Sequence, residues 1–151
     1  MDKDSFVRQI DRCSGMMFRV AWSILQNGED CRDAMQETAL KAWEKRRTLR
    51  DEAYFTTWIV RILINACRDI QRKRRRTVPL DWAPEPAAEP PDPSLALALQ
   101  RLPEKLRLPL VMQCSEGMSY AEISRALRIT ESAVRGRIHR AKEQLRKELE
   151  V

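Results

Sequence analysis

The chain has 151 residues and is basic, with 28 Lys and Arg residues against 22 Asp and Glu residues and a formal net charge of +6. Its four cysteines are widely spaced and it has one histidine, so we expect neither a disulfide framework nor a bound metal. No apolar stretch is long enough to cross a bilayer and the first residues lack a secretory core, which predicts a protein of the reducing cytoplasm without direct membrane insertion.

The charge is unevenly distributed along the chain. Residues 1–77 carry 17 basic and 11 acidic side chains, net +6, and residues 101–151 carry 11 and 7, net +4. Residues 78–100 between them carry four acidic side chains and no basic one, net −4. Two basic blocks around an acidic segment predict two modules that bind a polyanion, joined by a spacer that nucleic acid repels. Two ordinary solvated surfaces are the alternative interpretation.

Apolar residues recur at helical spacing along nearly the whole chain, and strand-like alternation is absent, so the predicted fold class is all-α. Helices are predicted over residues 5–26, 29–45 and 55–73, which together form an N-terminal helical bundle, domain 1–77. Asn27 and Gly28 are expected to end the first helix, because glycine adopts the left-handed conformation at low cost.

Six of the eight prolines fall within residues 78–93. Proline lacks a backbone donor and cannot continue a helix, so this segment is predicted to be an extended, Pro-rich acidic linker. The second small helical domain is predicted over residues 94–151. Its helices are expected over residues 95–101, 103–117, 119–127 and 131–149, with Pro109 inside the second of them and a capping box, Ser119 with Glu122, opening the third.

The last two predicted helices and the turn at residues 128–130 have the form of a helix-turn-helix, which places its second helix in the DNA major groove. Arginine can donate two hydrogen bonds to guanine, a contact worth about 1–3 kcal/mol of discrimination. Gly136 indicates either a close approach of backbone to DNA or a neutral surface position, and both interpretations stay open. The candidate DNA-contacting residues of this helix are Ser132, Arg135, Arg137, His139 and Arg140.

A second candidate DNA surface follows the predicted helix over residues 55–73. Polar side chains recur there at steps of four, three and four residues, and a basic run over residues 72–76 follows. Neighbouring aromatic side chains suit stacking on unpaired bases. A solvated face is the alternative, and for Trp58 a core position. The candidates are Tyr54, Trp58, Arg61, Asn65, Arg68, Arg72, Lys73 and Arg74.

The predicted helix over residues 29–45 has one edge of mixed charge, formed by Asp33, Gln36, Glu37 and Lys41. Carboxylates are poorly placed to contact phosphates, so this edge favours a protein partner. An ordinary solvated helix surface is the alternative interpretation.

Two stretches of the first domain resemble the first conserved domain of extracytoplasmic-function (group IV) sigma factors of the sigma-70 family. They are Asp33-Ala-Met-Gln-Glu-Thr38 with Lys41-Ala-Trp43, and Phe55-Thr-Thr-Trp-Ile59 with Asn65 and Arg68-Asp69. The resemblance to their second domain is carried by Leu102-Pro103 with Arg107, Glu116 to Ile123, and Val134 to Ala141. It covers almost the whole chain, in the family's order and with a linker between the domains.

The resemblance implies a sigma factor that directs core RNA polymerase to specific promoters and opens the −10 element. It implies that Asp33, Gln36, Glu37 and Lys41 bind the β′ clamp helices, and that the polymerase β flap is a further contact. The aromatic and basic residues of the first domain would bind the −10 element, with Asn65 and Arg61 at a flipped base. The second domain would read the −35 element through Arg135, His139 and Arg140.

The resemblance further implies an anti-sigma factor as a partner, in the cytoplasm of a bacterium or held at its membrane. Gly136 and His139 depart from the serine and aromatic residue that many members have, which leaves the −35 preference open.

No catalytic constellation is present, since the chain has one histidine and no Gly-rich phosphate loop. The sequence therefore predicts no enzyme, no cofactor and no small-molecule substrate. One alternative is a stand-alone helix-turn-helix regulator, which does not need the polar edge of the helix over residues 29–45. Another is a sigma-like mimic that titrates an anti-sigma factor, which does not need Arg135, Arg140 or the basic run.

Overall fold

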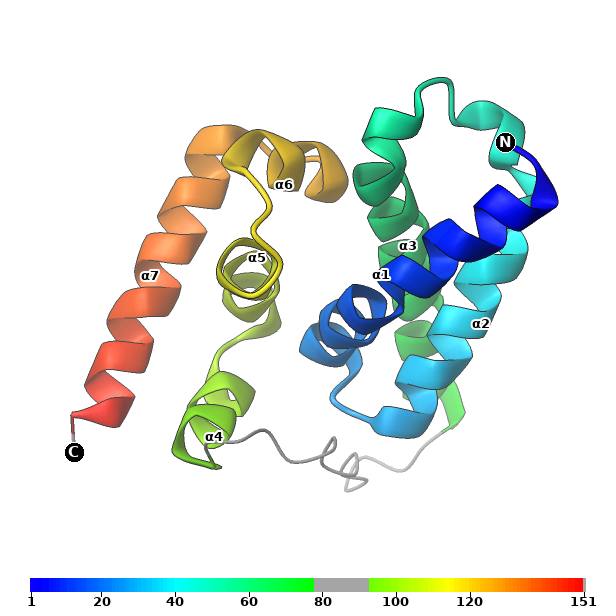
Figure 1. Ribbon diagram of the computed structural model, residues 1–151. Coiled ribbons are helices and arrows are strands. Elements are labelled where there is room, and N and C mark those ends of the chain that lie inside the picture. The colour runs from blue at the N-terminus through cyan, green and yellow to red at the C-terminus, as the bar shows by residue number, and fades with distance from the viewer. Residues whose placement is uncertain (78–92, 151) are drawn as a thin grey trace. The chain divides into compact units, whose positions relative to one another are not determined.

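The structure is a computed structural model that describes residues 1–77 and 93–150 (Figure 1). The chain divides into two compact units, Met1–Glu85 and Pro86–Val151. Every regular element within the described residues is a helix, which confirms the predicted all-α class. Among these residues, no helix has the length and apolar character that crossing a membrane requires.

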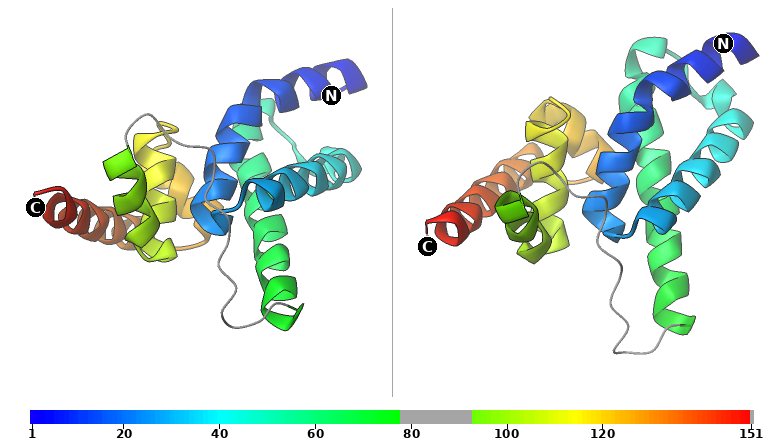
Figure 2. Two further views of the ribbon diagram at one scale, coloured as in Figure 1. Left: turned by 90° about the horizontal axis from the view of Figure 1, so that it is seen from below. Right: turned by 60° about the horizontal axis from the view of Figure 1, so that its bottom comes forward.

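The first unit is built from three long helices, α1 (Lys3–Leu25), α2 (Gly28–Glu44) and α3 (Phe55–Thr77). Two short 3-10 helices, η1 (Arg46–Thr48) and η2 (Glu52–Tyr54), lie between α2 and α3. Figures 1 and 2 show the three long helices packed against one another. The predicted helices are confirmed to within a few residues, and α3 is longer than expected, so that the whole basic run lies within it.

The connection between α1 and α2 differs from the prediction. Gln26, with φ 50°, is the left-handed residue that closes α1, and its backbone N–H donates to the carbonyl of Trp22. Asn27 is the N-cap of α2, where its side chain accepts a hydrogen bond from the Asp30 N–H at 2.9 Å. An N-cap residue is extended, so the chain reversal falls one residue earlier and Gly28 simply begins α2.

The core of the first unit lies where the three helices meet, and side chains with almost no exposed surface fill it: Met17, Val20, Ala34, Ile59, Val60 and Leu63. Cys31 and Cys67 are also fully buried. Burial raises the pKa of the Cys31 thiol to about 11, because the thiolate would lose its solvation there. Cys31 is therefore a protonated, apolar packing residue at neutral pH.

The second unit consists of α4 (Pro93–Arg101), α5 (Glu104–Cys114), α6 (Tyr120–Leu127) and α7 (Glu131–Leu149), all four of which the sequence predicts. The predicted linker, residues 78–93, lies outside the described residues except for Pro93. Pro109 is buried inside α5, which continues through it. Helix α7 packs along α5 and against α6.

The core of the second unit is formed by Leu106, Met112, Ile123, Val134 and Ile138, each of which is at most 3% exposed. Arg107 is buried beside them, and its Nη1 donates to the carbonyl of Leu102 at 2.6 Å. Burial lowers the pKa of this guanidinium, which still stays charged at neutral pH. Its hydrogen bond therefore fastens the turn between α4 and α5.

Candidate nucleic-acid and polymerase interfaces

Helices α6 and α7 form the helix-turn-helix, and hydrogen bonds of the caps fix where each helix begins. The Ser119 hydroxyl accepts from the Glu122 N–H at 3.1 Å, and the Glu122 carboxylate accepts from the Ser119 N–H at 3.0 Å. Arg128, with φ 58°, closes α6, and Thr130 caps α7 by accepting from the Ala133 N–H at 3.0 Å. The start of the candidate recognition helix is thus set by local sequence.

The turn is also tied to α6. The Ser124 hydroxyl of α6 donates to the carbonyl of Ile129 at 2.6 Å. Val134 and Ile138 of α7 are almost completely buried against the unit. The opposite side of α7 is consequently left to face a partner.

The candidate residues of α7 lie mainly on this outer side. Ser132, Arg135, His139 and Arg140 are exposed, whereas Arg137 is half-buried. At 3.6 residues per turn, positions 132, 135 and 139 share one face, position 140 adjoins it, and position 137 lies on the far flank of the buried stripe. The structure therefore brings four of the five candidates together and sets Arg137 apart.

Two further features bear on this face. The guanidinium of Arg135 lies over the ring of Tyr120, 5.3 Å from its centroid. Tyr120 is half-buried. A Cβ at Gly136 would meet the Arg140 side chain at 3.4 Å, an ordinary contact, so packing within the unit does not require glycine there.

The candidate surface of the first unit combines α3 with the segment before it. Tyr54 is 54% exposed at the end of η2, and Asn65 is exposed at the middle of α3. Arg61 and Arg68 are partly exposed on the same helix. Trp58 is half-buried, and its Nε1 donates to the Thr48 hydroxyl at 3.0 Å. Trp58 thus fastens the α2–α3 connection to α3 instead of lying wholly in the core.

Two members of the basic run are paired with carboxylates of their own unit. Arg72 pairs with Asp69, one turn before it in α3. Arg74 contacts both carboxylate oxygens of Asp30 at 2.5 Å, and the Asp30 side chain is only 5% exposed. Arg74 is therefore turned toward α2, while Lys73, Arg75 and Arg76 are exposed.

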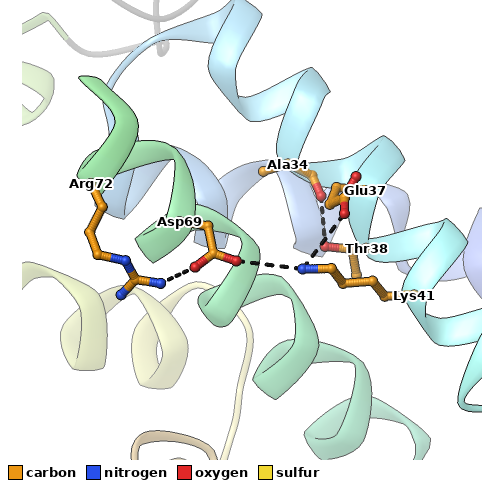
Figure 3. A network of polar contacts seen from close by, with 6 residues as sticks. All are labelled: Ala34, Glu37, Thr38, Lys41, Asp69 and Arg72. Carbon is orange, nitrogen blue, oxygen red and sulfur yellow. Dashed lines mark hydrogen bonds and ion pairs between the residues drawn. The ribbon is translucent and has the colours of Figure 1, made fainter. Parts of the chain in front are cut away.

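The polar edge of α2 is connected to the basic end of α3 (Figure 3). Asp33, Gln36 and Glu37 are exposed, and Lys41 lies 3.6 Å from Glu37. Lys41 Nζ is also 3.5 Å from Asp69 Oδ2, and Asp69 in turn pairs with Arg72. We did not predict a role for Asp69, because no pattern in the sequence pairs position 41 with position 69.

An open groove with a volume of about 640 Å³ lies between α2 and the C-terminal half of α3, and we call it the α2–α3 groove. Its charged lining residues are Asp33, Glu37, Lys41, Asp69, Arg72, Lys73, Arg74 and Arg76. Candidates that we assigned from the sequence to two different partners, polymerase and DNA, therefore line one surface. Within residues 1–77 and 93–150, no group of side chains is arranged to hold a metal ion.

A helix-turn-helix with an arginine-rich outer face, together with a second helical unit that has an aromatic and basic surface, defines a two-domain DNA-binding protein. Comparison with known families agrees with this class. Residues 10–77 match the model of sigma-70 region 2, and residues 94–145 match that of sigma-70 region 4.

Similar proteins are known in several bacteria. The ECF RNA polymerase sigma factor SigM of Mycobacterium tuberculosis is 30% identical over 150 residues, covering 95% of this chain and 76% of the relative. SigE of Mycolicibacterium smegmatis is 33% identical over 159 residues, covering 95% of this chain but only 60% of that longer relative. SigW of Bacillus subtilis is 28% identical, covering 98% and 90%.

Solved structures agree on the fold. The sigma factor RpoE in complex with the anti-sigma factor NepR from Bartonella quintana has a TM-score of 0.86 at 22% identity, covering 97% of this chain and 98% of that one. CnrH in complex with the cytosolic domain of CnrY has a TM-score of 0.75 at 24% identity, covering 99% and 90%.

The chain belongs to the extracytoplasmic-function family of RNA polymerase sigma factors. The predicted family and its function in transcription initiation are thereby confirmed, and the stand-alone regulator and the mimic are not favoured. The roles of individual residues and the domain boundaries stay predictions.

Proposed function

We propose that this sigma factor uses its first unit to bind core RNA polymerase and the melted −10 element, and its second unit to bind the −35 element. The observation that carries the proposal is the α2–α3 groove. Carboxylates that suit a protein partner and cations that suit phosphates line this one surface. A subunit that must hold polymerase and opened DNA together needs both, whereas a stand-alone regulator needs only the cations.

In the −10 complex, Tyr54 and Asn65 bind unpaired bases. The exposed Tyr54 ring offers a face on which a base can stack, and the Asn65 amide offers a donor and an acceptor for a base edge. The Trp58 ring, whose orientation is fixed by its hydrogen bond to Thr48, borders the base-binding surface. Arg61, Arg68, Arg72 and Lys73 neutralise neighbouring phosphates, whereas Arg74 supports the surface from within, through Asp30.

In the −35 complex, Arg135, His139 and Arg140 contact base edges from the outer face of α7, with Ser132 near the helix start. Arg137, on the flank of the helix, contacts the phosphate backbone, which contributes affinity without sequence preference. The N-terminal end of a recognition helix is where such contacts concentrate, and Thr130 fixes that end here.

Asp33, Gln36 and Glu37 contact the β′ clamp helices of polymerase directly, in this proposal, and Lys41 orients the edge through its ion pairs with Glu37 and Asp69. The β flap is the expected contact of the second unit. The protein acts by binding and not by catalysis, without a cofactor. The solved structure of RpoE with the anti-sigma factor NepR supports such a partner for this chain in the bacterial cytoplasm, or at the membrane if the partner is anchored there.

The test is complex formation with bacterial core RNA polymerase on a sizing column. The wild-type chain is expected to form a stoichiometric complex, and Asp33→Lys with Glu37→Lys is expected to abolish it because the edge then repels its partner. Asp11→Lys, which reverses an exposed carboxylate on α1, is the control and should bind as wild type does. A double reversal that binds normally would contradict the assignment of α2.

A further inference from the structure

We propose that Tyr120 is a positioning residue for Arg135: its ring holds the guanidinium in place before DNA arrives, so that reading of the −35 element depends on Tyr120. The inference rests on the proposed function, because it takes α7 as the helix that reads duplex DNA. It adds a residue of α6 to the base-reading residues, which the sequence placed on α7.

Tyr120 is held at a defined place. It is the first residue of α6, directly after Ser119, whose capping box with Glu122 fixes the backbone on both sides of the N-cap. Its side chain is half-buried where α6 packs against α7. The backbone that carries the ring is therefore fixed, and partial burial of the ring restricts its rotamers, so it offers a defined platform.

Arg135 is, by contrast, a long exposed side chain with many rotamers. Its guanidinium carbon lies 5.3 Å from the centroid of the Tyr120 ring, within the range of a cation–π contact. Within the described residues Arg135 has neither an ion pair nor a hydrogen bond. The ring is therefore the contact that restricts the guanidinium, and it removes part of the ordering that DNA binding would otherwise require.

A cation–π contact leaves the hydrogen-bonding chemistry that DNA needs intact. The guanidinium is planar, and its five N–H donors point outward in its plane. An aromatic ring against one face leaves the edge free to donate two hydrogen bonds to O6 and N7 of a guanine. A carboxylate partner would instead occupy that edge, which is why an aromatic platform suits a base-reading arginine.

Arg140 supplies an internal comparison. It lies on the same outer side of α7, and among residues 93–150 it has no aromatic partner. If Tyr120 acts through Arg135, its replacement must leave the contribution of Arg140 unchanged. If Tyr120 only stabilises the fold or contacts phosphate through its hydroxyl, its replacement has the same effect whether or not Arg135 is present.

The experiment is a double-mutant cycle with the full chain bound to core RNA polymerase. A promoter duplex is first selected by the wild-type complex from a pool randomised at the −35 position. The measured quantity is the ratio of affinities for that duplex and for the same duplex with a scrambled −35 element. Thermal unfolding of each variant is followed in parallel.

Tyr120→Leu, which keeps the bulk but not the aromatic face, is expected to lower this ratio about two- to fivefold. Tyr120→Phe should keep the wild-type ratio. The loss caused by Tyr120→Leu should vanish in an Arg135→Ala background and persist in an Arg140→Ala background.

Four results would overturn the inference. A Tyr120→Leu loss that persists without Arg135 would assign Tyr120 another role, and a Tyr120→Phe loss of the same size would assign the hydroxyl a direct phosphate contact. If Tyr120→Leu keeps the wild-type affinity ratio while Arg135→Ala lowers it, the inference is overturned but the proposed function is not. A wild-type ratio in Arg135→Ala would overturn it together with the proposed role of α7.

Discussion

The two candidate DNA surfaces differ in what holds their charged side chains. In the first unit, ion pairs within the domain engage them: Asp69 pairs with Lys41 and Arg72, and Asp30 with Arg74. On α7, Arg135 is restrained by an aromatic ring instead of a carboxylate. If both surfaces bind DNA as proposed, the first must exchange internal partners for external ones, whereas Arg135 on the second keeps its hydrogen-bond donors available. This difference agrees with the proposed partners: a melted strand of variable shape for the first surface and a regular duplex for the second.

The largest expected effect comes from the Asp30–Arg74 pair. Asp30→Ala removes a buried carboxylate that accepts a short hydrogen bond from Arg74 and forms an ion pair with it, and it should lower the free energy of unfolding by about 2 kcal/mol. Arg74 is one-third exposed and can reach solvent, which keeps the loss below that of a fully buried pair. Urea unfolding of the full chain measures it. Asp33→Ala, at an exposed position of the same helix, is the control and should change stability little.

Arg140→Ala tests whether the second surface reads sequence. We expect about a tenfold loss of promoter use, or about 1.4 kcal/mol, because a bidentate contact to a base is lost. Run-off transcription from promoters with and without an intact −35 element measures it. An equal loss on both templates would show that Arg140 contributes affinity only and would remove the contrast with the first surface.

Asn65→Ala tests the first surface in the same way. Loss of one or two hydrogen bonds to a flipped base should slow promoter opening about fivefold and leave duplex binding unchanged. Permanganate reactivity of the −10 thymines reports opening directly. Gln71→Ala on the same helix is unsuitable as a control because Gln71 bonds to Arg68, so Asp11→Ala, at an exposed position of α1, serves instead. Normal reactivity in Asn65→Ala would mean that another residue captures the base.

Asp69→Asn has the smallest expected effect. It tests whether the carboxylate of Asp69 competes with DNA for Arg72. It weakens two partly exposed ion pairs, so stability should change by less than about 1 kcal/mol. Affinity for single-stranded DNA should rise about twofold, since Arg72 loses a competing carboxylate and the surface loses a negative charge. Fluorescence anisotropy at two salt concentrations measures it. If affinity falls, Asp69 positions Arg72 for DNA instead of competing with it.

Local sequence predicted most of the fold, and tertiary contacts account for what it missed. Caps such as Ser119 with Glu122, and Thr130 before α7, act within one turn, so the bounds of α6 and α7 were predictable. The Asn27–Gly28 error arose between two local signals, a helix-closing glycine and a helix-starting asparagine, of which the second prevailed. The Asp30–Arg74 and Lys41–Asp69 pairs join residues 44 and 28 positions apart, and no periodicity reports such contacts.

In the candidate site as well, local patterns were predictable from the sequence and tertiary contacts were not. The residues of α7 on its outer face were predictable from helical periodicity, because one face of the helix had to be buried. The Tyr120–Arg135 contact was not, since it depends on how two helices cross. Trp58 shows the intermediate case: its position on α3 was predictable, but its hydrogen bond to Thr48 was not.

Gly136 has a consequence for how such a protein changes over evolutionary time. The space beside it accepts a Cβ at an ordinary contact distance, and replacing a mid-helix glycine with alanine or serine raises helix stability by a few tenths to about 1 kcal/mol. A substitution there places new atoms on the outer face of α7 without harming the fold. Promoter preference can therefore drift at this position under selection for regulation alone, with no compensating mutation elsewhere in the gene.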